Sequence, residues 1–497
     1  MFRVMTTAAA LVAAVIAAPS ASAETSRVTV TPLTIDVTVG PDDDTRCSVT
    51  ADLYRPASAT RDAPAPAILT THGFGGSKRG SDQVAIGEGF AREGYVVMTY
   101  SSLGFGGSGC KIYLDDPDWD GEAGSQLIDV LAGAKTATDE ETGEPVTIDF
   151  VRLDAPGDPR VGMVGGSYGG QNQYAVAAVS QKVDALVPLV TWNDLTYSLA
   201  PNNSGLGGGV SPSVPGVHKK QWTSLFFGQG IVNGVQGVTV DPSRMAGCPN
   251  FHDPVCAAKA QLEALGYPSP ETTALARHAS VASYLDQITA PTLLLQGQRD
   301  TLFNLQEAAA TYRALKAQGT PVSMIWHSFG HSGGQQKPEL DLQADNVRDS
   351  HLGARIADWF DRWLRDDESA PTGPEFSYFR DWVFDDTGDV AEAYASAEAY
   401  PVGRAVPFYL SGNDGLTPSR NAVTAGQQSF AAAPGGAPTS YSETSALEGN
   451  AVNNPPSDTT GTFGAWTSPP LAGPLSIVGA PTLEVRLSAP SAELSQA

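Results

Sequence analysis

The sequence predicts an α/β fold in which helices cover both faces of a largely parallel β-sheet. Short runs that are almost wholly apolar indicate strands buried on both faces; they are residues 66–71, 94–100, 160–165, 185–190 and 292–296. Apolar residues at helical spacing lie between and after these runs, in residues 127–134, 305–315 and 352–364. Strands that alternate with helices along a chain are typical of such a sheet. Two extended segments, residues 28–39 and 48–54, come before the first of these units.

The first residues have the pattern of an export signal. Arg3 gives a short positive start, residues 8–18 form an apolar run too short to cross a bilayer, and residues 21–23 are a small-residue cleavage site. We therefore expect residues 1–23 to be a signal peptide that is removed from a secreted protein. No later run reaches the roughly 18 apolar residues of a spanning helix, so no membrane span is expected.

Length and charge limit the domain organisation and the partners. A chain of 497 residues is long enough for two or three domains. We place an α/β domain at residues 24–388, with an inserted cap at about 195–285, where a glycine- and proline-rich stretch breaks the alternation. Residues 389–497 predict a β-rich C-terminal domain, with strand-like alternation in 406–410 and 482–487. The formal net charge of −24 repels phosphate backbones, so no nucleic-acid partner is expected.

The four cysteines predict disulfides, which an exported protein can form. Cys248 and Cys256 are close enough in sequence for a local loop, which leaves Cys47 and Cys110 for a second bridge. Four cysteines allow three pairings, so the connectivity stays open at this point. Metal binding is the other interpretation, but there is no CxxC pair and no cluster of histidines beside them.

Residues 165–170 (GGSYGG) have the sequence of a nucleophile elbow, the sharp strand-to-helix turn that exposes a reactive serine. They follow the apolar run that ends at residue 165 and precede a helical run at 172–179. The residues two before and two after the serine must be nearly free of side chains, and Gly165 and Gly169 meet that demand. This context predicts that Ser167 is a nucleophile.

A second GxSxG copy occurs at residues 330–334, with Ser332 at its centre. A nucleophile there would need an acid and then a histidine downstream, and only His351 remains. Pro338 would also interrupt the helix that should follow the turn. We therefore interpret Ser332 as a loop serine.

The partners of Ser167 follow in the order, acid and then histidine, that the α/β-hydrolase fold uses. Asp300 comes just past the strand at 292–296, and His331 comes just past a last strand at 322–326. An imidazole takes the serine proton and returns it to the leaving group, and a buried carboxylate orients the imidazole. The sequence therefore predicts a Ser167, His331 and Asp300 triad and acyl transfer to water.

Two alternatives concern these partners. Asp300 could be the N-cap of a helix that begins near Leu302. His327 could take the place of His331, but it lies within or at the end of the last strand.

An oxyanion hole usually combines the amide after the nucleophile with an amide from the loop after an early strand. The first is that of Tyr168. The second should come from the glycine-rich turn at residues 71–76 (THGFGG), and we choose Phe74. Alternatively, residues 71–76 form only a tight turn.

No metal and no cofactor are expected. Residues 116–121 (DPDWDG) begin like a calcium loop, but the twelfth position is Leu127, where a glutamate is needed. We interpret them as an acidic surface turn.

These motifs resemble the X-Pro dipeptidyl-peptidase and cocaine-esterase family of serine hydrolases. The resemblance covers roughly residues 28–490 and rests on GGSYGG around Ser167, on the loop at 104–109 (GFGGSG), on WNDL at 192–195, and on the order of hydrolase domain, cap and β-rich tail. It implies an α/β-hydrolase fold followed by a jelly-roll domain. The chain departs from the family in two ways. Several members donate an oxyanion hydrogen bond from a tyrosine hydroxyl where this chain has Phe74, and the tail is too short for a whole jelly roll.

The leading functional hypothesis is hydrolysis of peptide or amide bonds through a Ser167 acyl-enzyme, as an X-Pro dipeptidyl-peptidase-like exopeptidase. Such an enzyme must hold the substrate's ammonium group with a carboxylate, and the candidates in or beside the cap are Asp194, Asp253, Glu271 and Asp286. The alternative is a carboxylesterase with the same triad, whose acyl pocket could be lined by Trp192, Trp222, Phe226 and Phe227. A third interpretation is a non-catalytic protein whose tail binds a polymer.

Overall fold

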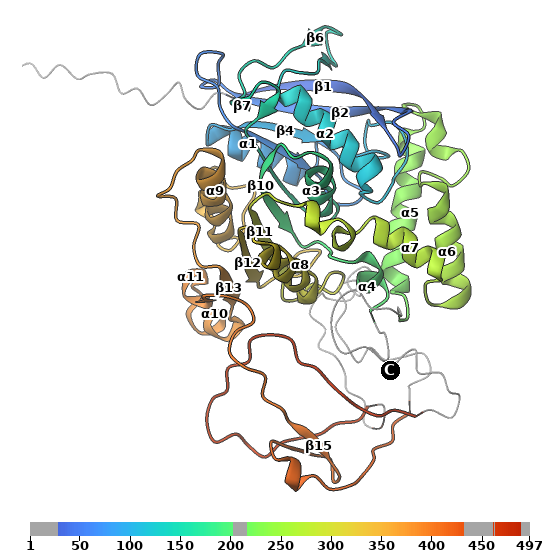
Figure 1. Cartoon of the computed structure of the whole chain (residues 1–497), viewed down its shortest axis with the longest axis vertical. Helices are drawn as coiled ribbons and strands as arrows, with labels where there is room; N and C mark the ends of the chain where they lie inside the picture. Colours follow the sequence, from blue (N-terminus) through green and yellow to red (C-terminus); the bar gives the residue numbers. More distant parts are fainter. Residues whose placement is uncertain (1–27, 202–215, 432–460, 462, 489–497) are drawn as a thin grey trace, which may run out of the picture.

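The structure is a computed structural model that describes residues 28–201, 216–431, 461 and 463–488 (Figure 1). The signal peptide predicted at residues 1–23 lies outside these residues. Within them, no helix has both the length and the apolar character that crossing a bilayer requires.

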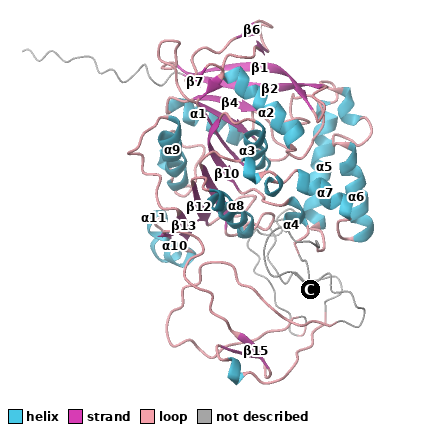
Figure 2. Ribbon diagram, in the orientation of Figure 1, coloured by secondary structure: helices cyan, strands magenta, loops and turns pink. Residues whose placement is uncertain are grey.

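One large mixed sheet forms the centre of the α/β domain (Figure 2). Among the described residues it has twelve strands, in the order β14-β13-β12-β11-β10-β9-β3-β4-β2-β1-β5-β6. Their bounds are β1 (Val28–Val39), β2 (Thr45–Pro56), β3 (Ala67–Thr71), β4 (Val96–Tyr100), β5 (Ala137–Asp139), β6 (Pro145–Val146), β9 (Val161–Gly166), β10 (Val183–Leu189), β11 (Thr292–Gly297), β12 (Val322–His327), β13 (Phe376–Phe379) and β14 (Tyr394–Ala397). The strands from β4 to β13 in this order are parallel, and the outer pairs are antiparallel. A separate small pair consists of β7 (Leu153–Ala155) and β8 (Asp158–Pro159).

Helices cover both faces of this sheet. Those of the α/β domain are α1 (Ser81–Arg92), α2 (Glu122–Leu131), α3 (Tyr168–Val179), α8 (Leu305–Gln318), α9 (His351–Leu364), α10 (Asp381–Thr387) and α11 (Val390–Ala393). Phe90 of α1 and Phe360 of α9 belong to one buried cluster, which lies on one face of the sheet. Leu127 of α2, Val176 of α3 and Tyr312 of α8 belong to the cluster on the other face. The predicted α/β fold is confirmed, and the five predicted apolar strands agree with β3, β4, β9, β10 and β11 to within two residues at each end.

The segment predicted as a cap is helical in its described part. It contains α4 (Leu195–Leu199), α5 (Lys220–Gly237), α6 (Asp253–Leu265) and α7 (Pro270–His278), and the last three lie together beside the sheet (Figure 1). Arg244, in a short helical turn between α5 and α6, is fully buried and joins the cap to the α/β domain. Its guanidinium donates hydrogen bonds to the carbonyl oxygens of Gly106 and Ser108, at 3.1 and 3.2 Å.

Both disulfides suggested by the cysteine spacing are present. Cys47 of β2 is bonded to Cys110, and Cys248 is bonded to Cys256 in the cap. The first bridge connects β2 to the loop after β4. The second connects the loop before α6 to the first turn of α6.

The C-terminal part has less regular structure than its alternation predicts. Its described residues contain β15 (Tyr409–Ser411) and β16 (Gly415–Thr417), which pair with each other, whereas the predicted strand at 482–487 is irregular. Alternation alone does not form a strand, because the backbone groups also need a neighbouring strand to bond. Leu483 is 66% exposed there. The division of the chain at residue 388 stays a prediction. β14 comes after this position in the sequence and pairs with β13 in the main sheet.

His327, at the end of β12, is a fully buried histidine with no hydrogen-bond partner for either ring nitrogen among the described residues. Its ring stacks on Phe329 with 3.6 Å between centroids. Burial lowers the pKa of His327 to about 3, because desolvation disfavours the imidazolium.

We expect replacement of His327 by Phe to make the protein less sensitive to acid. The unfolded chain binds a proton at His327 below its ordinary pKa of about 6.5, whereas the folded chain does so only near pH 3, so stability is lost as the pH falls between these values. Urea unfolding at pH 7.5 and at pH 5 measures the effect. The loss between these two pH values should be about 2 kcal/mol smaller for His327→Phe than for the wild type. An equal loss in both proteins would contradict the assignment.

Candidate active site

Ser167 lies on the sharp turn between β9 and α3, as the elbow motif predicts. Its backbone has φ 56° and ψ −120°, a conformation that residues with side chains rarely adopt. The flanking glycines make the turn possible. A Cβ at Gly169 would lie 2.2 Å from the carbonyl oxygen of Thr71, and one at Gly165 would lie 2.7 Å from the carbonyl oxygen of Gly169. Any larger residue at either position would therefore displace the serine.

His331 connects Ser167 to Asp300. Its Nε2 is 2.9 Å from Ser167 Oγ, and its Nδ1 is 3.1 Å from Asp300 Oδ2. The side chains of His331 and Asp300 are 8% and 0% exposed. With Nδ1–H donating to the carboxylate, Nε2 is left as the acceptor for the serine proton.

Four donors surround the Asp300 carboxylate. Oδ1 accepts hydrogen bonds from the backbone N–H groups of Leu302 and Phe303, at 2.9 and 2.7 Å. Oδ2 accepts from Gln296 Nε2 at 3.2 Å as well as from His331. Asp300 is not the N-cap of a helix, because α8 begins at Leu305 and Asn304 is its N-cap. The four contacts hold the carboxylate in place beside His331.

The loop after β3 passes beside the serine. A Cβ at Gly73 would lie 3.7 Å from Ser167 Cβ, and Phe74 follows directly. The backbone N–H groups of Phe74 and Tyr168 donate no hydrogen bond within the described part of the chain. The role of Phe74 and Tyr168 as oxyanion donors stays a prediction.

Aromatic side chains from the cap and the α/β domain form a buried cluster beside His331. It contains Phe105, Tyr168, Trp192, Trp222, Phe251 and Phe303, with Phe74, Phe226 and Phe227 packed against it. The rings of Phe303 and Trp222 lie edge-on to His331, with centroid distances of 5.0 and 5.9 Å. The sequence did not indicate Phe251 and Phe303, and it indicated Phe105 only within the loop at 104–109. Phe303 follows Asp300 by three residues, which is the signal that could have found it.

Comparison with known proteins gives a match to one family. Residues 44–225 match the family described as X-Pro dipeptidyl-peptidase (S15 family). We call these residues the S15 segment. The S15 segment runs from the turn before β2 into α5, so it includes Ser167 and Phe74 but neither Asp300 nor His331. The chain has the α/β-hydrolase fold, and its activity is the subject of the proposal below.

No curated protein matches the chain. Several solved structures resemble it at low identity. An α-amino acid ester hydrolase is 17% identical with a TM-score of 0.49, and the match covers 83% of this chain and 66% of that one. An aminopeptidase from a marine sediment archaeon, Thaumarchaeota archaeon, is 14% identical with a TM-score of 0.46, over 78% and 62%. An esterase of Pyrococcus furiosus is 13% identical with a TM-score of 0.38, over 67% and 92%. The chain therefore spans slightly less than two thirds of the length of the first two proteins.

The four carboxylates considered as ammonium anchors are bound elsewhere or exposed. Asp194 caps α4 by accepting from the N–H of Thr196 at 2.8 Å, and it lies 3.5 Å from the guanidinium of Arg277. Asp253 is exposed and accepts from the N–H of Cys248. Glu271 and Asp286 are also exposed.

Two buried acids lie behind Tyr168, next to the S15 serine. The Tyr168 hydroxyl accepts from the backbone N–H of Asp115 at 3.1 Å. Burial and the neighbouring Asp116 raise the pKa of Asp120 to about 8, and burial with the Asp120 charge raises that of Asp115. Burial thus disfavours the charged form of both carboxyl groups behind Tyr168.

One group of side chains among the described residues has the spacing of a metal site. Asp116, Asp118 and His278 each place a ligand atom within 4.8 Å of the others. The imidazole Nε2 of His278 lies 3.2 Å from Asp116 and 3.4 Å from Asp118. The hydrogen bond to Asp116 is the main cause that raises the pKa of His278 to about 9. These contacts connect the end of α7 to the loop before α2.

We expect Gly169→Ala to abolish activity, because the added methyl group would lie 2.2 Å from the Thr71 carbonyl oxygen and force the elbow apart. Ester hydrolysis and the thermal unfolding midpoint should both be measured. Gly228→Ala in α5 is the matched control, because nothing lies within 4 Å of a Cβ there. Full activity in Gly169→Ala would show that the turn differs from the one described.

Proposed function

We propose that this chain is a serine hydrolase with Ser167, His331 and Asp300 as its catalytic triad and that it works through an acyl-enzyme. The 2.9 Å contact between His331 Nε2 and Ser167 Oγ carries the proposal, because a general base must reach the proton that it removes. The Asp300 carboxylate supports it by holding the Nδ1–H tautomer and stabilising the imidazolium that forms.

The proposed reaction has two halves. Ser167 Oγ forms a bond to the acyl carbon while its proton passes to His331 Nε2, and the N–H groups of Tyr168 and Phe74 bind the oxyanion. The bond to the leaving group then breaks, and the leaving group takes the proton from His331. A water molecule, deprotonated by His331, attacks the Ser167 ester in the same way and releases the carboxylic acid.

We propose that the acyl group is apolar and that the bond is a carboxylic ester. The aromatic cluster formed by Trp222, Phe226, Phe303 and their neighbours suits an apolar or aromatic acyl group. A free ammonium group would need a desolvated carboxylate there. The four candidates are engaged in capping and ion pairs or are exposed.

The exopeptidase predicted from the sequence is the second candidate. It is favoured by the match of residues 44–225 to the X-Pro dipeptidyl-peptidase family. Under either candidate we propose export through the signal at residues 1–23, which the disulfides Cys47–Cys110 and Cys248–Cys256 support, because such bonds persist in oxidising compartments.

Substrate pairs that differ only at the amino group separate the two candidates. An exopeptidase should lose at least about 100-fold in kcat/KM when Ala-Pro-p-nitroanilide is N-acetylated, because its carboxylate would be left unpaired. The esterase should hydrolyse p-nitrophenyl phenylacetate faster than both anilides and should distinguish little between them. A strong preference for the free dipeptide over every ester would overturn the esterase proposal.

Ser167→Ala should remove labelling by a fluorophosphonate probe and lower kcat by a factor of about 10⁶, because the triad members act as a unit. Ser332→Ala, in the second GxSxG sequence, is the matched control and should keep both properties. In-gel fluorescence of the purified full chain measures the labelling. Labelling that survives in Ser167→Ala and disappears in Ser332→Ala would assign the nucleophile to the second sequence instead.

A further inference from the structure

The loop between β3 and α1, residues 72–80, is rich in glycine. We call it the oxyanion loop, because it carries Phe74. Phe74 has glycine on both sides at residues 73 and 75, and a third glycine follows at residue 76. The ring of Phe74 is held by its packing on Phe105 and Tyr168. Glycine loses more conformational freedom on folding than any other residue, so the backbone beside this ring needs further contacts, and the two ends of the loop supply them.

His72 holds the first end. It is buried, its Nε2 accepts from the backbone N–H of Ser102 at 3.2 Å, and its Nδ1 donates to the carbonyl oxygen of Gly73 at 2.8 Å. Burial lowers the pKa of His72 to about 4. The imidazole is therefore neutral, which these two hydrogen bonds require.

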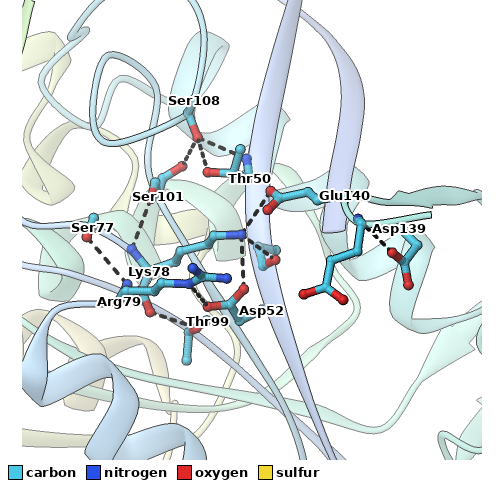
Figure 3. A network of polar contacts seen from close by, with 12 residues as sticks. Thr50, Asp52, Ser77, Lys78, Arg79, Thr99, Ser101, Ser108, Asp139 and Glu140 are labelled. Carbon is cyan, nitrogen blue, oxygen red and sulfur yellow. Dashed lines mark hydrogen bonds and ion pairs between the residues drawn. The ribbon is translucent and has the colours of Figure 1, made fainter. Parts of the chain in front are cut away.

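Lys78 holds the second end through its ammonium group. The side chain is only 9% exposed, and Nζ lies 3.0 Å from the carbonyl oxygen of Ala51, 3.0 Å from Asp52 Oδ1 and 2.9 Å from Glu140 Oε1 (Figure 3). Nζ donates hydrogen bonds to the Ala51 carbonyl oxygen and to Glu140, and its contact with Asp52 is an ion pair. These partners come from β2 and from the turn between β5 and β6.

The backbone of Lys78 is bound as well. Its N–H donates to Ser101 Oγ at 2.9 Å, and its carbonyl oxygen accepts from Thr99 Oγ1 at 3.1 Å. The next residue, Arg79, donates from Nε to the second oxygen of Asp52 at 3.1 Å. The end of the oxyanion loop is therefore attached to β2, β4 and the β5–β6 turn at once, as Figure 3 shows.

Stability alone does not explain a buried lysine. Desolvation of charges offsets most of the attraction in a buried ion pair, and well-packed apolar residues of similar volume often stabilise a protein equally. What the ammonium adds is direction, because two hydrogen bonds and one ion pair to two separate elements define one position for the chain at residue 78. The same buried carboxylate, Asp52, also binds Arg79.

Resting on the proposed function, we propose that Lys78 is a positioning residue for the reaction. It holds the oxyanion loop so that the N–H of Phe74 points at the oxygen that becomes negative in the transition state. Lys78 touches no substrate and acts through the three residues between it and Phe74.

Lys78→Met tests the proposal, because it keeps the length of the side chain and removes the ammonium. We expect kcat for p-nitrophenyl phenylacetate to fall about 10- to 100-fold, since a misplaced oxyanion donor costs rate in this range. KM should stay within about twofold, because the oxyanion contact is made in the transition state and not by the bound ester. Measurements should be made well below the unfolding midpoint of the variant.

Two further variants separate positioning from a general loss of stability. Lys182→Met is the matched control: it breaks the 2.6 Å ion pair of Lys182 with Asp129, away from the oxyanion loop, and should keep the wild-type kcat. Lys78→Arg restores a cation and should recover part of the lost kcat. If Lys78→Met does not fold, Glu140→Gln takes its place as the test. It removes the carboxylate charge of Glu140 beside Nζ and leaves the Asp52 contact. We therefore expect kcat to fall, but by less than the 10- to 100-fold expected for Lys78→Met.

Wild-type kcat in a folded Lys78→Met, or in Glu140→Gln where the first variant does not fold, would overturn the inference. So would a Lys182→Met variant that loses as much kcat as Lys78→Met. These results would leave the proposed function intact as long as Ser167-dependent labelling persists. Loss of that dependence in the wild type would overturn the proposed function and this inference together.

Discussion

The site depends on the parallel register of the strands from β9 to β12. Gly166 at the end of β9 is paired with Leu189 of β10, Leu189 with Leu295 of β11, and Gly297 with His327 of β12. The carboxyl ends of these strands therefore lie at one edge of the sheet, and Ser167, Asp300 and His331 follow within a few residues. Side chains that are 164 and 31 positions apart in sequence come within 3.1 Å because the sheet, and not the loops, sets their separation.

The parts of this arrangement that depend on local sterics could be predicted from the sequence. A strand buried on both faces has to be apolar throughout, so β3, β9 and β11 are visible as short apolar runs. The elbow is visible because the backbone approaches so closely that only Gly165 and Gly169 fit. Chain order then indicated Asp300 and His331, and the structure places them in contact with each other.

Contacts between elements far apart in the chain could not be predicted in the same way. Lys78 and Arg79 are adjacent basic residues, which are mostly exposed in proteins, so the sequence does not indicate that they are bound. Asp52 lies beside Lys78 only because β2 pairs with β4. The ring of Phe303 faces His331 because Asp300 binds the N–H of that residue, a contact that no periodicity indicates. The prediction of a strand at 482–487 was wrong, because the sequence alternates there but no neighbouring strand pairs with it among the described residues.

The edge of the sheet at the carboxyl ends of its parallel strands combines two demands that conflict. Backbone must approach the reacting atoms closely, which favours glycine, as in the oxyanion loop and in the loop at 104–109, yet glycine contributes no side chain to hold a loop. The few side chains of these loops therefore matter, and the rings of Phe74 and Phe105 pack against each other with 5.1 Å between centroids. A buried cation adds to this at each loop. Arg244 of the cap donates to two carbonyl oxygens of the loop at 104–109, and Lys78, near the end of the oxyanion loop, donates to a carbonyl oxygen of β2. A cation with several donors can fix a glycine-rich backbone, which explains why this edge keeps charges that cost energy to bury.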